Sequence, residues 1–291
     1  MKPSPFEYDD ARTVEEAVAL LAEHGEDAKV LAGGQSLVPL LNFRLARPER
    51  LIDINNVGEL DYLRVGDGSL RIGALVRHSA LERSEEAAAA VPLLREAVRL
   101  VGHVQIRNRG TVGGSIAHAD PAAELPVALA ALEARFRMRS TRGERVLGAD
   151  ELFVTHLTTS LEADELLTEI EVPLPAPGTG WAFVEFARRH GDFALGGAAA
   201  LVRLSEGGSC EGAAIALLAA ASTPVRAREA EEFLRGRQLD DRTVREAAAL
   251  AGANVRPTGD IHGSSEYRHG LIEVMTRRAL VVAAGRAKEV A

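Results

Sequence analysis

The feature that most constrains this chain is a Gly-Gly pair that occurs twice, each time beside a hydroxyl side chain. The first lies in KVLAGGQSLVPL, residues 29–40, and the second in TVGGS, residues 111–115. Glycine lacks Cβ, so its N–H can approach a ligand closely and its backbone can adopt positive φ. The first segment predicts a strand, a Gly-Gly loop and a helix, with Ser36 as the N-cap and Pro39 in the first turn.

Loops of this kind suit phosphate, because a helix start has free N–H groups and partial positive charge. Two of them could hold the two phosphates of a pyrophosphate from opposite sides. A side chain added at Gly33 or Gly113 would then occupy the place of a phosphate. The alternative is that each pair is an ordinary turn, and one short motif leaves both open. The sequence lacks G-x-x-x-x-G-K-[ST] and G-x-G-x-x-G, the two common nucleotide fingerprints.

Composition narrows the classes of protein that fit. The 291 residues are 46% hydrophobic and 26% charged, which is long enough for two domains. A net charge of −8 without a basic run argues against a nucleic-acid partner. One cysteine, Cys210, cannot by itself supply a disulfide, a four-thiolate zinc site or an iron–sulfur cluster. The start MKPSPFEYDD has no apolar leader, and the run at 213–221 is too short to cross a bilayer, so a cytoplasmic protein is expected.

The pattern along the chain predicts a mixed architecture with a boundary near residue 175. Thr13 to Glu16 form a capping box for a helix that Gly25 ends. Asp67-Gly68 predicts a hairpin turn, and the apolar stretch before Pro173 predicts an edge strand. After the linker PLPAPGTG come strands joined by a glycine-rich turn and then three helices. The predicted domains are 1–175 and 176–291.

The motifs together resemble one family over practically the whole chain. AGGQS (32–36), TVGGS (111–115), ARRHGDFALGGAAA (187–200), ASTPVRAREAEEFLRG (221–236) and EYRHGLIEVMTRRAL (266–280) are similar to segments of the FAD-binding medium subunit of molybdenum hydroxylases, the group of carbon monoxide and xanthine dehydrogenases. The resemblance implies an α+β fold. Its first domain would be an FAD-binding unit of two α/β subdomains, of the PCMH or vanillyl-alcohol-oxidase type. Its second would combine a three-stranded antiparallel sheet with a three-helix bundle.

The resemblance also implies a non-covalent FAD site in which the two loops embrace the pyrophosphate. Glu124 falls where the family places an acidic cofactor contact, and Phe193 where an aromatic residue often lies near the flavin. Glu185 departs from the family, which commonly has lysine thereabouts. The implied contacts are Lys29, Val30, Leu31, Ala32, Gly33, Gly34, Gln35, Ser36, Leu37, Val101, Thr111, Val112, Gly113, Gly114, Ser115, Ala119, Asp120, Glu124 and Phe193.

By the same resemblance the chain is an electron-transfer subunit. Electrons would come from a molybdenum cofactor on a large subunit, through two [2Fe–2S] clusters on a small subunit, to FAD here, and then to NAD⁺, a quinone or oxygen. A dimer of heterotrimers is implied. The alternative is a free-standing FAD-dependent reductase of the same cofactor fold.

Several single residues have a plain structural interpretation beside the functional one. Asp120 before Pro121 is most simply a helix N-cap, and Glu124 alone would be a solvated carboxylate. Arg107 and Arg109 fit either a phosphate contact or a solvated surface. We expect no catalytic residue and no metal site on this chain.

Overall fold

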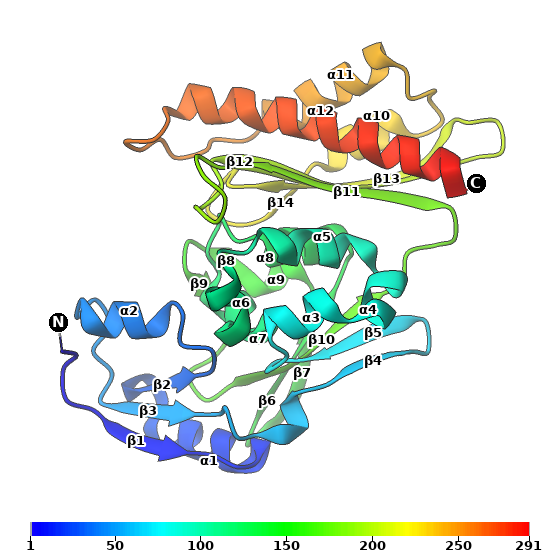
Figure 1. Ribbon diagram of the computed structural model, residues 1–291. Coiled ribbons are helices and arrows are strands. Elements are labelled where there is room, and N and C mark those ends of the chain that lie inside the picture. The colour runs from blue at the N-terminus through cyan, green and yellow to red at the C-terminus, as the bar shows by residue number, and fades with distance from the viewer. Residues whose placement is uncertain (1, 291) are drawn as a thin grey trace.

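The computed structural model describes residues 2–290, and its elements form three tiers (Figure 1). The first tier is a parallel sheet in the order β1-β3-β2, packed against α1. As predicted, the Thr13 hydroxyl accepts from the Glu16 N–H at 3.1 Å, and Gly25 ends the helix with φ 51°. The elements are β1 (Glu7–Asp10), α1 (Val14–His24), a 3-10 turn η1 (Gly25–Asp27), β2 (Ala28–Leu31), α2 (Leu37–Asn42) and β3 (Arg50–Asp53).

The second tier is an antiparallel sheet in the order β4-β5-β10-β6-β7, with short helices on one face. Asp67 and Gly68 form the predicted hairpin turn, and both have positive φ, 50° and 75°. The elements are η2 (Gly58–Leu60), β4 (Leu63–Gly66), β5 (Ser69–Gly73), α3 (His78–Arg83), α4 (Glu85–Ala90), α5 (Pro92–Leu100), α6 (Val104–Arg109), α7 (Val112–His118), α8 (Glu124–Ala131), β6 (Arg135–Ser140), β7 (Gly143–Leu147), α9 (Ala149–Leu152), β8 (Phe153–Thr155), β9 (Thr158–Thr159) and β10 (Leu166–Pro173).

The prediction of an edge strand before Pro173 is wrong, because β10 is the central strand of this sheet. It pairs with β5 on one side and with β6 on the other. Its burial alternates along the strand: Thr168, Ile170 and Val172 are buried, whereas Glu169 and Glu171 are partly exposed. Pro173 is its last residue, opposite Ser69, so its missing N–H falls where the ladder ends.

The third tier is an antiparallel sheet in the order β11-β12-β13-β14, with α12 lying across its outer face (Figure 1). Three of its strands are long, as the resemblance implies, and the two-residue strand β14 forms one edge. The three predicted helices follow β14 in the chain. No helix within residues 2–290 has the length and apolar character that a membrane span needs. The elements are β11 (Thr179–Phe186), β12 (Gly196–Leu204), β13 (Cys210–Leu218), β14 (Val225–Arg226), α10 (Arg228–Leu234), α11 (Asp241–Ala253) and α12 (Ser265–Val290).

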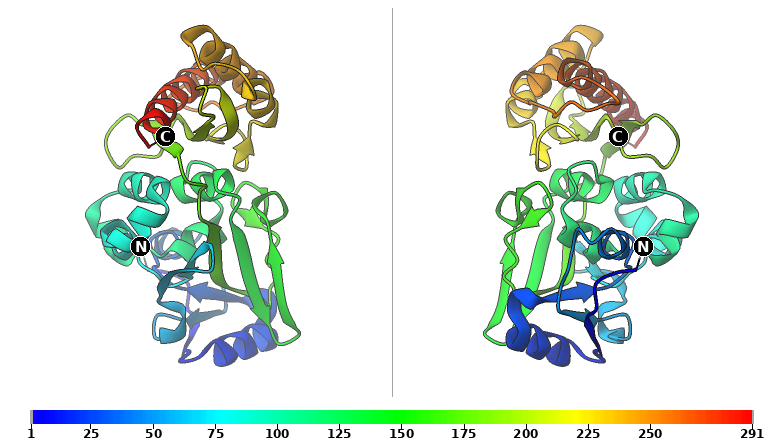
Figure 2. Two further views of the ribbon diagram at one scale, coloured as in Figure 1. Left: turned by 90° about the vertical axis from the view of Figure 1, so that its right-hand side faces the viewer. Right: turned by 90° about the vertical axis from the view of Figure 1, so that its left-hand side faces the viewer.

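Helix α8 lies between the second and third tiers and is buried at every residue. A short helix that is apolar all round is stable only when other elements cover it on all sides. One continuous core therefore joins Phe136 of β6, Leu125 and Leu129 of α8, and Phe183 of β11. The side views show the layer of helices between the third tier and the rest of the molecule (Figure 2). This packing fixes the start of α8, where Glu124 lies, relative to both sheets.

Candidate functional site

The fold brings the two predicted glycine loops into direct backbone contact. A Cβ built on Gly33 would lie 2.5 Å from the carbonyl oxygen of Arg109 and 2.8 Å from Cα of Gly110. Both distances are shorter than any real Cβ contact, so only glycine fits at residue 33. Arg109 and Gly110 directly precede Thr111, so the first loop packs against the entrance of the second.

The first loop presents a run of free backbone amides. Within residues 2–290, the N–H groups of Gly33, Gly34, Gln35, Ser36 and Leu37 have no protein acceptor. Gly34 has φ 73°, and the loop is only partly exposed. Ser36 stands at the predicted N-cap position of α2, but its hydroxyl makes no cap hydrogen bond. Consecutive free backbone amides form a binding site for an anion.

The second loop differs, because the fold already uses most of its amides. The N–H of Val112 donates to Val76 and that of Gly113 to Ala74, both at 2.9 Å. The Thr111 hydroxyl caps α7 by accepting from the Gly114 N–H at 3.1 Å. The Thr111 amide, the Thr111 hydroxyl proton and the Ser115 hydroxyl have no partner among residues 2–290. The two loops are therefore unequal: the first offers amides and the second offers mainly hydroxyls.

The glycines allow close packing of the backbone at these loops. An added side chain would therefore meet protein atoms, and not occupy the place of a phosphate as expected. A Cβ on Gly113 would lie 2.7 Å from the carbonyl oxygen of Ala74, so it would meet the neighbouring chain and not a phosphate. At Gly33 it would meet the backbone of the second loop. Both substitutions would displace the loops themselves.

A buried histidine supports the second loop from below. His78 is 5% exposed, and its Nε2 lies 2.9 Å from the carbonyl oxygen of Thr111. A carbonyl oxygen only accepts, so Nε2 carries the proton, and Nδ1 has no partner within residues 2–290. Burial, with the charges of Arg107 and Arg77 adding to it, lowers the pKa of His78 to about 4. His78 is therefore neutral at pH 7. No sequence motif indicated a role for this residue.

Asp120 and Glu124 take different places from those expected. Asp120 is not a helix N-cap: its carboxylate accepts from the Ala122 N–H at 2.8 Å in a local turn, and α8 begins only at Glu124. Glu124 is 7% exposed, which rules out a solvated carboxylate. Burial first, and then the nearby charge of Glu185, raises the pKa of Glu124 to about 8. Burial also raises the pKa of Glu185 to about 7, and its Oε2 has no partner within residues 2–290.

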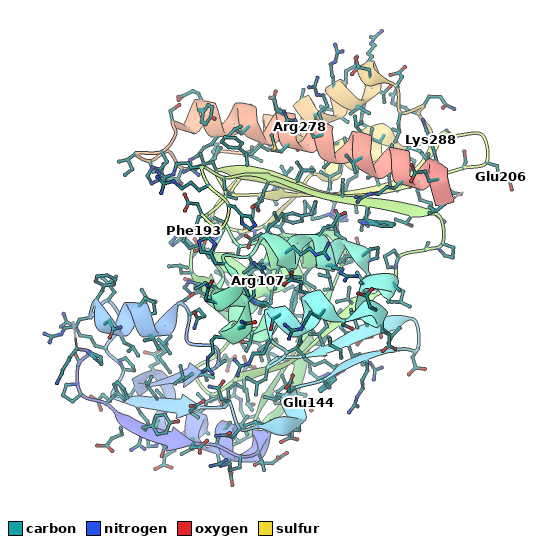
Figure 3. The ribbon with its side chains drawn as sticks, viewed as in Figure 1. Arg107, Glu144, Phe193, Glu206, Arg278 and Lys288 are labelled. Atoms are coloured by element: carbon teal, nitrogen blue, oxygen red, sulfur yellow. The ribbon has the colours of Figure 1, made fainter. Side chains whose placement is uncertain are left out.

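Phe193 lies in the loop between β11 and β12, with its side chain 72% exposed. This loop reaches from the third tier to the helix that precedes the second glycine loop (Figure 3). The rings of His190 and His103 are 6.3 Å apart, and Gly191 packs against the His103 ring. His103 is the N-cap residue of α6, which leads into Thr111. The structure thus places the Phe193 loop on the same side of the molecule as the second glycine loop.

The other expected contacts are spread around these loops. Lys29 to Leu31 form the end of β2, and Ala119 follows α7 in a left-handed conformation, φ 53°. Val101 follows α5, and its carbonyl oxygen accepts from Arg107 at 3.1 Å. Arg107 is itself buried and pairs with Glu82 at 2.8 Å, so it is a structural residue and not a phosphate contact.

Two polar residues that the sequence did not single out lie between the loops. Asn55, after β3, donates to the carbonyl oxygen of Ala32 at 2.8 Å, and Arg77, before α3, donates to the side chain of Asn55 at 2.6 Å. Neither belongs to a recognisable motif. Their role depends on contacts between distant parts of the chain.

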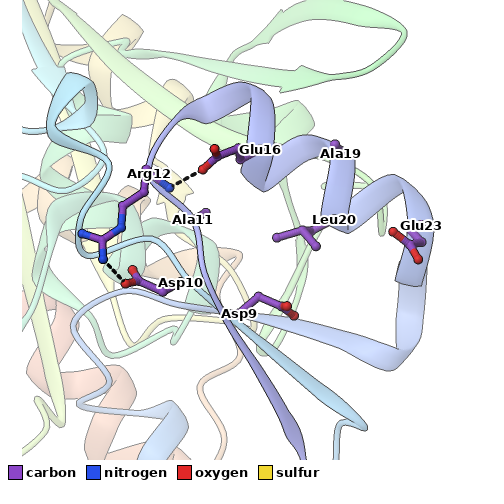
Figure 4. Close-up of a pocket in the computed structure, with 8 residues that line it drawn as sticks. All are labelled: Asp9, Asp10, Ala11, Arg12, Glu16, Ala19, Leu20 and Glu23. Carbon is purple, nitrogen blue, oxygen red and sulfur yellow. Dashed lines mark hydrogen bonds and ion pairs between the residues drawn. The ribbon is translucent and has the colours of Figure 1, made fainter.

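A pocket between β1 and α1 is acidic, whereas the glycine loops offer hydrogen-bond donors (Figure 4). Asp9, Asp10, Glu16 and Glu23 line it, with Arg12 as the one base. Its carboxylates repel an anion, so it does not compete with the glycine loops as a phosphate site. Within residues 2–290, no group of three His, Cys, Asp or Glu side chains could hold a metal ion. Burial raises the pKa of the Cys210 thiol, which keeps it unreactive.

These features agree with comparisons against known proteins. Residues 4–175 match the FAD binding domain in molybdopterin dehydrogenase, and residues 181–283 match the CO dehydrogenase flavoprotein C-terminal domain. The chain is 48% identical to the 6-hydroxypseudooxynicotine dehydrogenase complex subunit alpha of Paenarthrobacter nicotinovorans, covering 99% of this chain and 97% of that protein. It is 39% identical to the carbon monoxide dehydrogenase medium chain of Afipia carboxidovorans, covering 99% and 100%.

A solved structure gives the same result for the fold. Carbon monoxide dehydrogenase from Hydrogenophaga pseudoflava, in a form that lacks the Mo-pyranopterin moiety, superposes with a TM-score of 0.96 at 42% identity, covering 98% of this chain and 99% of that one. The expected α+β fold is confirmed, and so is the FAD-binding character of the first domain. The chain belongs to the family of FAD-binding flavoprotein subunits of the molybdenum hydroxylases.

Proposed function

We propose that this chain is the electron-transfer subunit of a molybdenum-containing hydroxylase. It would take electrons from [2Fe–2S] clusters on a partner subunit and pass them to NAD⁺, a quinone or oxygen. The observation that carries the proposal is the contact of Gly33 with Arg109 and Gly110, which sets five free amides beside the hydroxyls of the second loop. This donor set fits a pyrophosphate, and FAD contains one.

In this proposal the amides of Gly33 to Leu37 bind the phosphates, and the hydroxyls of Thr111 and Ser115 complete the site. Glu124 donates or accepts one hydrogen bond, according to its protonation. Phe193 approaches the flavin from the third tier. Bound FAD would supply the redox chemistry, since the protein contributes binding and orientation. We also propose that the chain divides near residue 175 into a cofactor domain and a smaller second domain.

The proposed partner subunits would hold the iron–sulfur clusters and the molybdenum cofactor. The one cysteine of this chain cannot ligate an iron–sulfur cluster alone, so the clusters and the molybdenum cofactor would lie on a small and a large partner subunit. The names of two relatives, a complex subunit alpha and a medium chain, support an assembly of this kind. We propose a dimer of heterotrimers.

The test is to purify the full chain, both alone and coexpressed with the proposed small and large partner subunits. The absorption spectrum is recorded and the released cofactor is identified. We expect flavin bands and FAD in both preparations. Absence of FAD in both, even after addition of free FAD, would refute the proposal. Turnover of NADPH by the chain alone would favour the free-standing reductase instead.

A further inference from the structure

A continuous set of hydrogen bonds joins the first glycine loop to the second. The Asn55 amide group donates to the Ala32 carbonyl oxygen at 2.8 Å. One Arg77 nitrogen donates to Oδ1 of Asn55 at 2.6 Å, and another donates to the carbonyl oxygen of Arg109. Asp53 fixes Asn55 in turn by accepting from its backbone N–H at 2.8 Å and from its side-chain amide at 2.6 Å. Ala32 and Arg109 lie at the entrances of the two loops.

The Arg77 guanidinium is a half-buried cation that has no carboxylate at salt-bridge distance within residues 2–290, and Asp53 and Asp61 act on its charge only from farther away. Its acceptors are an amide oxygen and a carbonyl oxygen, both neutral. Burial, and then the positive charge of Arg109, lowers its pKa. A guanidinium stays protonated under all ordinary conditions, so a positive charge remains beside the free amides of the first loop.

We propose that Asn55 and Arg77 act as one positioning unit that sets the spacing of the two loops around a pyrophosphate, and that Arg77 also supplies positive charge to that site. The inference rests on the proposed FAD site and extends it to two residues that the glycine motifs do not include. The planar guanidinium suits this task because it can donate to two separate acceptors at once. A lysine ammonium keeps the charge but lacks the rigid fork that reaches both Asn55 and Arg109.

The test measures FAD affinity of the full chain by flavin fluorescence, with ADP as a competitor that carries the pyrophosphate without the flavin. We compare Arg77→Met, Arg77→Lys, Asn55→Ala and the double variant Asn55→Ala/Arg77→Met. Loss of a charged hydrogen-bond donor is expected to weaken FAD about 10- to 100-fold in Arg77→Met, with ADP weakened in parallel. Arg77→Lys should fall between it and the wild type. The double variant should lose no more than Arg77→Met, because both changes break one bridge.

Arg137→Met is the matched control, since Arg137 is a partly buried arginine on β6 whose side chain bonds Glu169 of β10 and Glu144 of β7, both outside the glycine loops. It should leave FAD affinity unchanged. If Arg77→Met fails to fold, Arg77→Lys and Asn55→Ala carry the comparison.

Negative results for the proposed function and for the positioning unit can be told apart. A wild-type chain that binds no FAD refutes the proposed function itself. A wild-type chain that binds FAD, with Arg77 and Asn55 variants within twofold of it, overturns only the positioning unit. Additive losses in the double variant, wild-type affinity in Arg77→Lys, or loss of FAD without loss of ADP would each overturn it as well.

Discussion

The imidazole of His78 lies beneath the second glycine loop, with Nε2 2.9 Å from the carbonyl oxygen of Thr111. The two residues are far apart in sequence, and their contact fixes the loop at the point where α7 begins. Because the ring is buried and neutral, this support depends on pH.

We expect the contribution of His78 to the free energy of unfolding to fall as the pH is lowered from 6.5 to 4, a range over which the contribution of Glu124 changes in the opposite direction. The pKa of His78 is about 4 in the folded chain and about 6.5 when unfolded, so the unfolded state binds the proton first. The contribution of His78 is complete above pH 6.5, and about 3 kcal/mol is lost by pH 4.

Urea unfolding of the wild type and of His78→Gln, measured at intervals from pH 7 to pH 4, tests this. Glutamine can still donate to Thr111 but does not titrate, so the variant should lose less stability over this range. Equal pH dependence in the two proteins would show that His78 is not the group responsible.

The glycine of the first loop should be sensitive to even one methyl group. In Gly33→Ala the added Cβ lies 2.5 Å from the Arg109 carbonyl oxygen, so the two loops must separate. Overpacking of this kind costs about 1–3 kcal/mol of stability, and FAD affinity should fall with it. The measurements are thermal unfolding and FAD titration of the same preparation.

Gly285→Ala is the matched control for that substitution. A Cβ at Gly285, in α12, meets nothing within 4 Å, and alanine favours a helix by about 1 kcal/mol over glycine. It should therefore stabilise the chain and leave FAD binding unchanged. A Gly33→Ala variant with normal stability and affinity would mean that the loops are not in contact in solution.

The sequence located the loops because glycine pairs, hydroxyls and helix starts form short local patterns. Local patterns also predicted the cap at Thr13 and the hairpin at Asp67-Gly68, both of which are confirmed. They failed where tertiary packing decides. Asp120 is a residue type that often caps a helix, but here it forms a local turn with Ala122. Helix α8 begins only at Glu124, because it lies between the two sheets.

Residues that act through distant contacts left no such pattern. Asn55 and Arg77 are separated by 22 positions, and their partners lie in two further segments. Each is an ordinary polar residue next to an element end, and its place becomes apparent only when β3, α3 and the second loop meet. The same holds for the central position of β10, because the pairing order of a sheet is a long-range property.

Glu124 should make the FAD-free chain less stable at high pH. Its pKa is raised from 4.5 to about 8, so the folded chain holds the proton more tightly than the unfolded one. The contribution of Glu124 to stability is therefore complete below pH 4.5 and is lost as the pH rises toward 8. Glu185 adds to this effect, because its charge is the second cause of the shift.

Glu124→Gln removes the titration and keeps the size and hydrogen-bonding capacity of the side chain. We expect its unfolding midpoint in urea to match that of the wild type near pH 4.5 and to exceed it increasingly from pH 6 to pH 9. Glu144→Gln, at a partly exposed carboxylate on β7, serves as the control and should follow the wild-type curve. If Glu124→Gln follows that curve as well, the Glu124 carboxyl group is ionised in the folded chain, and in the proposed site it would accept a hydrogen bond from the cofactor instead of donating one.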